Sequence, residues 1–87
     1  MKFKILGIEH IGVAQNSGSN KLSNFFSDTL NLHSTKELVD NQKVITEIFD
    51  TGSGKIELLY PSDKSSVLDK FLSKKGESIH HIAILVD

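Results

Sequence analysis

Two histidines near opposite ends of the sequence stand in nearly the same surroundings. His10 lies in the run 8–14 (IEHIGVA), and His81 lies in the run 79–85 (IHHIAIL). Both runs are otherwise rich in Ile, Val, Ala and Gly, which is typical of strands. Side chains alternate across a strand, so each histidine shares its face with small or apolar neighbours that leave room for a ligand.

A carboxylate lies on another strand-like run between the two histidines. Glu57 occurs within 55–60 (KIELLY), among apolar residues where a charge should not face a dry core without a partner. Taken singly, each of the three residues is explained as a hydrogen-bonded core or surface residue. Taken together, the repeat predicts a metal site of His10, Glu57 and His81. Two imidazoles and a carboxylate suit Mn, Fe, Co, Ni or Zn, with positions left for substrate or water.

The pattern of the chain predicts the elements that would position these residues. Apolar residues at helical spacing, followed by Asn31 as a possible left-handed cap, favour a helix over 22–30. A second helix is expected after Pro61, with Ser62 as its N-cap and Gly76 as its C-cap. Its expected apolar face is Val67, Leu68, Phe71 and Leu72. Strands are expected over 4–14, 33–39, 43–50, 55–60 and 79–86, with a turn at 51–54.

Composition limits the classes of protein that this chain can be. Its 87 residues allow one domain, and the absence of cysteine excludes disulfides and thiolate chemistry. The net charge of −1, with no long basic stripe, argues against nucleic acid as a partner. No apolar run approaches the ~18 residues of a membrane span. Glu9 and His10 interrupt the apolar start, so we expect a strand of a soluble, cytoplasmic protein there and not a signal peptide.

Several segments resemble the vicinal oxygen chelate superfamily, which includes glyoxalases, bleomycin resistance proteins and dioxygenases. The resemblance covers essentially the whole chain, and its most specific part, the second histidine run with its upstream helix, is similar to methylmalonyl-CoA epimerases. The segments that carry it are EHIGVA at 9–14, Phe25-Phe26 with Leu30-Asn31-Leu32, KIELLYP at 55–61, Lys70-Phe71-Leu72 with Gly76, and IHHIA at 79–83.

The resemblance implies an α+β fold of the glyoxalase-like type, in which a βαβββ module curls to form half of a cup. Residues 1–61 would form the first module, 62–78 the linking helix, and 79–87 the first strand of a second, truncated module. It also implies a homodimer.

The resemblance assigns the metal ligands by position. His10 matches the first-strand ligand, Glu57 the fourth-strand ligand and His81 the ligand that opens the second module, for a divalent Co, Mn, Ni or Zn ion. Glu57 is also the candidate catalytic residue, mainly as a ligand and as a base only if it leaves the metal. By strand parity His80 should point to the opposite face, as an outer residue or as one that supports a ligand without binding the metal, and His33 should lie on the surface.

Two positions depart from the pattern of the epimerases. Their fourth ligand is a glutamate late in the second module, and the sequence ends at Asp87 before that point. Some epimerases are thought to use a further glutamate on the third strand, which aligns with Thr46. Glu47, one residue along, should face the other way unless a bulge redirects it.

The implied function is epimerase-like removal of the proton α to the carbonyl of an acyl-CoA thioester. Three alternatives remain open from the sequence. The first is another metal-dependent enzyme on the same scaffold, such as a glyoxalase I-type lactoylglutathione lyase or an iron dioxygenase. The second is a metal-free small-molecule-binding protein, and the third is a fragment without activity of its own.

Overall fold

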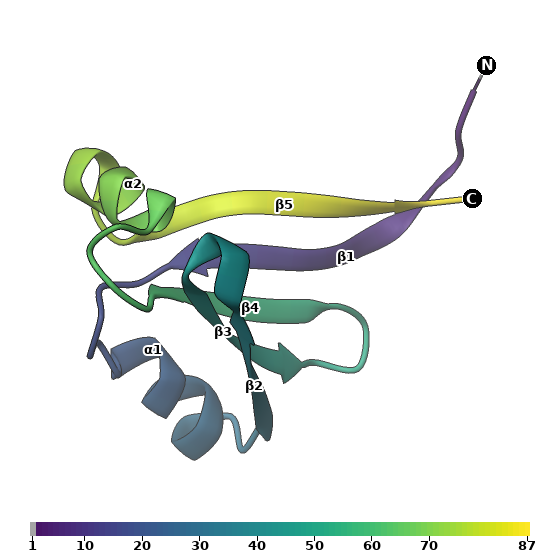
Figure 1. Cartoon of the computed structure of the whole chain (residues 1–87). Helices are drawn as coiled ribbons and strands as arrows, with labels where there is room; N and C mark the ends of the chain where they lie inside the picture. Colours follow the sequence, from purple (N-terminus) through teal and green to yellow (C-terminus); the bar gives the residue numbers. More distant parts are fainter. Residues whose placement is uncertain (1) are drawn as a thin grey trace.

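The computed structural model describes residues 2–87, which form one five-stranded mixed sheet with helical segments on both faces (Figure 1). The strand order across the sheet is β2-β3-β4-β1-β5. The α+β class and the glyoxalase-like architecture expected from the sequence are confirmed. In chain order the elements are β1 (Ile5–Ala14), α1 (Lys21–Asn24), the π-helix η1 (Phe25–Thr29), β2 (Ser34–Val39), the 3-10 helix η2 (Asp40–Gln42), β3 (Val44–Asp50), β4 (Lys55–Pro61), α2 (Val67–Lys75) and β5 (Ser78–Val86).

Strand β1 lies between the two other strands that carry predicted ligands. It pairs in parallel with β4 and antiparallel with β5. Parallel neighbours require a crossover, and α1, η1 and the β2–β3 hairpin supply it. The two ends of the chain therefore meet side by side, as the internal similarity of the sequence suggested (Figure 1).

One face of the sheet is covered by α1 and η1. The ring of Phe26 packs on Phe49 with centroids 5.3 Å apart, and Phe49 is fully buried. The single helix expected over 22–30 is instead a short α-helix that widens into a π-helix, closed by an i→i+5 bond from Leu30 N to Phe25 O. The predicted end is confirmed, because Asn31 adopts the left-handed conformation with φ 54°.

The other face of the sheet carries α2, whose Leu68 and Leu72 pack on Ala14 and Leu59. These four side chains are buried, and they form the small core on this side. Phe71 is partly buried against the same core, whereas Val67 is exposed, contrary to the expected apolar face.

The predicted N-cap of this helix was wrong by one turn. Ser62 N donates to Lys43 O at 2.8 Å, which extends the β3–β4 ladder and holds Ser62 outside the helix. The N-cap is Ser66, whose hydroxyl oxygen accepts a hydrogen bond from Leu68 N. The predicted C-cap is confirmed, since Gly76 has φ 71° and its N–H bonds to Leu72 O.

The five predicted strands form close to their expected bounds, and Thr51 N bonds to Gly54 O across the predicted turn. Within residues 2–87, the structure contains no helix with the length and apolar character needed to cross a membrane.

Candidate metal centre

A glycine in the middle of β1 makes room for the predicted ligands. Gly12 is paired with Glu57 on β4 and with His81 on β5, so the three residues form one row across the sheet. The His81 ring lies over Gly12, where a Cβ would overlap it. His10 is two residues earlier on β1, on the same face as Gly12.

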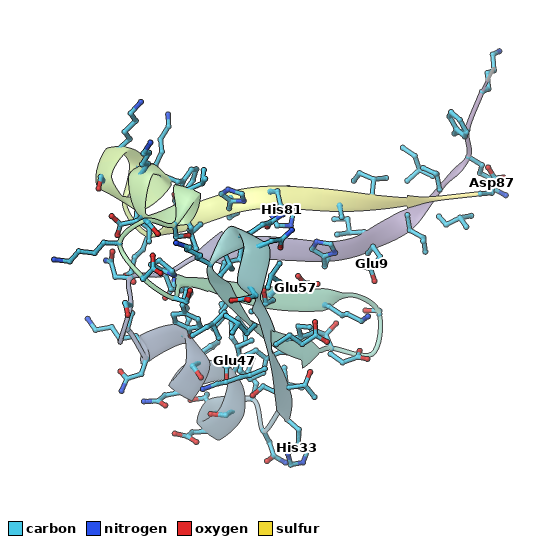
Figure 2. All side chains as sticks on the ribbon, in the orientation of Figure 1. Glu9, His33, Glu47, Glu57, His81 and Asp87 are labelled. Carbon is cyan, nitrogen blue, oxygen red and sulfur yellow. The ribbon has the colours of Figure 1, made fainter. Side chains whose placement is uncertain are left out.

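The structure brings His10 close to each of the other two predicted ligands, Glu57 and His81. The Nε2 atoms of His10 and His81 are 2.9 Å apart, and Glu57 Oε2 is 3.6 Å from His10 Nδ1. Both His10 and Glu57 are largely buried, with side chains 20% and 18% exposed. Figure 2 shows Glu57 and His81 close together on the part of the sheet away from α1.

The separation of the two imidazoles fits a shared ion. Two nitrogens bonded to one metal at about 2.0–2.1 Å lie about 2.9 Å apart when the bonds meet at a right angle. Without an ion, the same distance is a hydrogen bond between the N–H of one ring and the lone pair of the other. The donor set of His10, Glu57 and His81 therefore fits a divalent transition-metal ion.

A second carboxylate, Glu9, contacts His10, and no pattern in the sequence indicated it. Its Oε1 atom is 2.7 Å from His10 Nδ1, and its Oε2 atom is 3.7 Å from Lys55 Nζ. The hydrogen bond with His10 holds the pKa of Glu9 below its usual value, and the charge of Lys55 acts in the same direction. Glu9, His10 and Glu57 offer ligand atoms within 4.8 Å of one another, and they are the one such group in the described part of the chain. His81 is not a member of this group, so the structure does not hold all three predicted ligands at mutual metal-binding distances.

The prediction that His80 faces away from the site was wrong. The register passes from Gly12–His81 to Val13–Ile79, which leaves His80 as an extra residue in β5. Such a bulge redirects a side chain. His80 Nδ1 lies 3.0 Å from His81 Nδ1, and its ring packs against Phe71 of α2 with centroids 4.8 Å apart.

The surroundings of His81 lower its pKa and so favour its neutral form. Burial is the main cause that lowers the pKa of His81, and the neighbouring His10 and His80 add to it, while Glu57 opposes them. A neutral imidazole has the lone pair that a metal ion needs.

A groove of ≈ 610 Å³ opens beside the candidate ligands. Glu57, His80 and His81 line it together with apolar side chains such as Leu59 and Leu68. Its size is in the range of small-molecule sites. Among the lining residues in the described part of the chain, Glu57 is the one carboxylate.

The side chains of β3 point to the faces that strand alternation predicts. β3 pairs with β4 residue for residue, so Thr46 faces the groove and Glu47 faces α1 (Figure 2). Glu47 is 4% exposed and accepts hydrogen bonds from Ser34 Oγ at 2.8 Å and Tyr60 OH at 3.2 Å. His33 is exposed beyond η1, as expected.

The sequence profile of the Glyoxalase/Bleomycin resistance protein/Dioxygenase superfamily matches residues 9–87. The chain belongs to this superfamily. The match includes all three predicted ligands and the groove residues beside them.

The relatives of this superfamily member include proteins of unknown and of established activity. The uncharacterized protein YqjC of Bacillus subtilis (strain 168) is 40% identical over 79 residues, which are 90% of this chain and 56% of that protein. Hypothetical protein BH1468 of Bacillus halodurans C-125 has 35% identity and a TM-score of 0.79, over 97% of this chain and 59% of its own.

Two solved methylmalonyl-CoA epimerases are also similar. The enzyme of Mycobacterium tuberculosis has 27% identity and a TM-score of 0.76, over 92% of this chain and 55% of its own. An epimerase in complex with methylmalonyl-CoA and NH4+ has 28% identity and a TM-score of 0.77, over 93% of this chain and 60% of its own. The chain thus spans little more than half the length of these relatives.

Proposed function

We propose that this chain contributes a His10–Glu57–His81 metal centre to an enzyme that removes the proton α to an acyl-CoA thioester, in the manner of a methylmalonyl-CoA epimerase. The observation that carries the proposal is the 2.9 Å approach of two histidine Nε2 atoms, with Glu57 3.6 Å from His10 Nδ1 and lining the same groove as His81. The similarity to the solved epimerases supports the same reaction class.

The proposed ion is a divalent Co, Mn, Ni or Zn held by the two histidines and Glu57. When bound, it would act as a Lewis acid on the carbonyl oxygens of the substrate. The chain itself supplies two imidazoles, a carboxylate at the groove and an apolar wall formed by residues such as Val44, Leu59 and Leu68. The apolar wall excludes water from one side of the substrate and strengthens electrostatic interactions within the groove.

The proposed substrate is an acyl-CoA thioester, because one of the similar epimerases is solved with methylmalonyl-CoA. Lys43 at the rim of the groove is half exposed, with its Nζ atom 2.6 Å from Ser65 Oγ and 3.8 Å from Asp63 Oδ2. We expect its ammonium group to exchange this surface pairing with Asp63 for a negatively charged group of the substrate.

Glu57 is the residue we propose as proton acceptor, since it is the groove's carboxylate within residues 2–87. In this role it must leave the metal while the substrate is bound. Complete epimerisation needs a second acid–base group on the opposite side of the substrate, because one group removes the proton and another returns it. Thr46 faces the groove where a third-strand carboxylate would lie, and its hydroxyl cannot act as that base at neutral pH.

We also propose that residues 1–61 form the first module, that 62–78 link it to a second, and that 79–87 open that second module. The supporting observation is that β5 pairs with β1 at the edge of the sheet. An unpaired strand edge is a ready surface for further strands, which supports the proposal of a homodimer.

Solvent deuterium exchange tests the proposed chemistry and needs only one base. The purified protein is incubated with Co²⁺ and methylmalonyl-CoA in D₂O, and deuterium at the α carbon is followed by mass spectrometry. We expect exchange faster than in a blank with Co²⁺ alone, and we expect that His81→Ala abolishes the difference. Exchange that never exceeds the blank would refute the proposed activity.

A second candidate is another metal-dependent reaction of the superfamily, such as a glyoxalase-type isomerisation. The observation that favours it is the groove-facing Thr46, with Glu47 turned to the other side of the sheet. Metal binding without exchange on methylmalonyl-CoA, together with turnover of the methylglyoxal–glutathione hemithioacetal, would support this candidate.

A further inference from the structure

The residue directly before each candidate ligand histidine makes the same kind of contact. Glu9 precedes His10, and His80 precedes His81, at equivalent positions of the two similar segments. Glu9 Oε1 is 2.7 Å from Nδ1 of His10, and His80 Nδ1 is 3.0 Å from Nδ1 of His81. In both cases the contacted atom is Nδ1, and the Nε2 atoms are left facing each other at 2.9 Å.

Both contacts depend on irregular pairing between β1 and β5. In a regular strand, consecutive side chains point to opposite faces. The register shifts between Ile8 and His10 on β1, and again where Gly12 pairs with His81 and Val13 with Ile79. Each shift adds an unpaired residue, which is Glu9 in one case and His80 in the other. The same kind of bulge, one in β1 and one in β5, therefore places a partner beside each histidine.

We propose that Glu9 and His80 are paired positioning residues, each of which accepts the Nδ1–H of the following histidine and leaves both Nε2 lone pairs to one metal ion. Metal-bound histidines commonly donate their second ring N–H to such a partner, which fixes the tautomer and the ring orientation. The inference rests on the proposed metal centre and adds residues to it that are not ligands.

The four side chains form one continuous series of hydrogen bonds, so their protons are linked. The ionised Glu9 can only accept, which places a proton on His10 Nδ1 and a lone pair on His10 Nε2. His81 must then donate from Nε2 to His10, and its Nδ1 must accept from His80 Nδ1. In the metal-free protein, His10 already has the tautomer that an ion needs, and His81 has the opposite one.

Ion binding therefore changes only the second half of the series. His81 would release its Nε2 proton to solvent and accept the Nδ1 proton of His80, and His80 would take up a solvent proton on Nε2. The number of protons on the two rings is unchanged. The ring of Phe71 packs against His80 and holds it in place during this exchange. The tautomer of His10 beside Glu9 thus stays the same when the ion binds, whereas the tautomers of His80 and His81 change.

The cluster of Glu9, His10 and Glu57 offers a competing geometry, in which the ion binds on the Nδ1 side of His10. In that arrangement Glu9 would be a ligand and His80 would have no role. Nitrogen-15 NMR of the histidine rings separates the two arrangements, because it identifies the protonated and the metal-bound nitrogen of each ring. Zinc is the suitable ion because it is diamagnetic.

The spectra should show His10 protonated at Nδ1 with and without zinc. His81 should change from Nε2–H to Nδ1–H when zinc is added, and His80 should change from Nδ1–H to Nε2–H. Zinc bound at Nδ1 of His10, or a His81 tautomer that does not change, would overturn the inference.

Zinc affinity, measured by competition with a chromophoric chelator, tests the two partners separately. Glu9→Ala and His80→Ala should each weaken binding by about 10- to 100-fold. Glu9→Gln and His80→Gln should recover part of the loss, since the amide oxygen can accept the same N–H. The exposed residues Glu37 and His33 provide the matched controls Glu37→Ala and His33→Ala, which should bind zinc like the unchanged protein.

The outcomes distinguish this inference from the proposed function. Normal zinc binding in Glu9→Ala and His80→Ala would remove the positioning role and leave the metal centre intact. Absence of zinc binding in the unchanged protein would overturn the metal centre and the inference together. Circular dichroism of each variant shows that a loss of affinity is not a loss of fold.

Discussion

Glu57 and Glu47 lie on neighbouring strands and have opposite surroundings. Glu57 on β4 faces the groove, 3.6 Å from His10, and its side chain is 18% exposed. Glu47 on β3 faces α1, is 4% exposed, and accepts hydrogen bonds from the hydroxyls of Ser34 and Tyr60. Glu47 pairs with Leu58, the residue next to Glu57, so the two glutamates point to opposite faces of the sheet.

This difference shows how one sheet provides both a reactive and a structural carboxylate. Two neutral hydroxyls can satisfy a buried carboxylate, so Glu47 needs no further partner. Glu57 instead lies 3.6 Å from His10 Nδ1 and lines an open groove, where a metal ion or a substrate proton can reach it. We therefore expect Glu57 to govern metal binding and Glu47 to govern stability.

The largest expected effect is on metal binding when Glu57 is removed. Glu57→Ala should weaken zinc affinity by at least about 100-fold, or about 2.7 kcal/mol, because it deletes one of three ligands. Isothermal titration or chelator competition measures this loss. Glu57→Gln keeps an oxygen donor, so it should lose less. A Glu57→Ala variant that binds zinc normally would end the distinction between the two carboxylates.

The next effect is on the free energy of unfolding when Glu47 is removed. Glu47→Ala leaves the Ser34 and Tyr60 hydroxyls without their acceptor and opens a small void, so it should cost about 2 kcal/mol. Urea unfolding gives this value, and Glu47→Gln should cost less. Zinc affinity should not change. A stable Glu47→Ala variant with impaired zinc binding would reverse the roles that we assign.

A smaller effect is expected at the glycine between the ligands. Gly12→Ala places a methyl group where the His81 ring lies, so the ring must move away from His10. We expect about a 10-fold loss of zinc affinity, or about 1.4 kcal/mol. Chelator competition measures the loss, and the circular dichroism spectrum of Gly12→Ala should match that of the unchanged protein.

The smallest effect concerns the titration of Tyr60, the only tyrosine in the sequence. Burial, and then the charge of Glu47, raise the pKa of Tyr60 to about 12. An unfolded tyrosine titrates near about 10, so the folded state holds this proton more tightly. The associated stability is fully present below pH ~10 and is lost as the pH rises towards ~12.

Ultraviolet absorbance of the phenolate measures the pKa of Tyr60 directly. Glu47→Gln removes the negative charge beside the phenol, so the pKa of Tyr60 should fall towards its usual value. An unchanged pKa in this variant would show that burial alone sets it and that Glu47 does not.

Apolar residues that recur every two residues in strands, and every three to four residues in helices, predicted most of the fold. Apolar runs located the strands, and Asn31 and Gly76 marked the ends of helices, because these signals act within a few residues. Ser62 was misplaced as a cap because its backbone N–H bonds to Lys43 across the hairpin. That contact depends on strand pairing, which no local pattern contains.

The same limit explains which site residues could be predicted. His10, Glu57 and His81 follow from a repeat and from strand parity, both of which are visible in the sequence. Glu9 and His80 do not, because strand bulges redirect them. A bulge arises from the pairing of β1 with β5, and it leaves no regular signal in either strand alone.

Metal content per chain, measured after purification and dialysis against zinc, tests the central claim most directly. The unchanged protein and the exposed-site control His33→Ala should each hold one ion per chain. His10→Ala and His81→Ala should hold none, while retaining the circular dichroism spectrum of the unchanged protein. Equal zinc in all four proteins would contradict the metal centre of His10, Glu57 and His81.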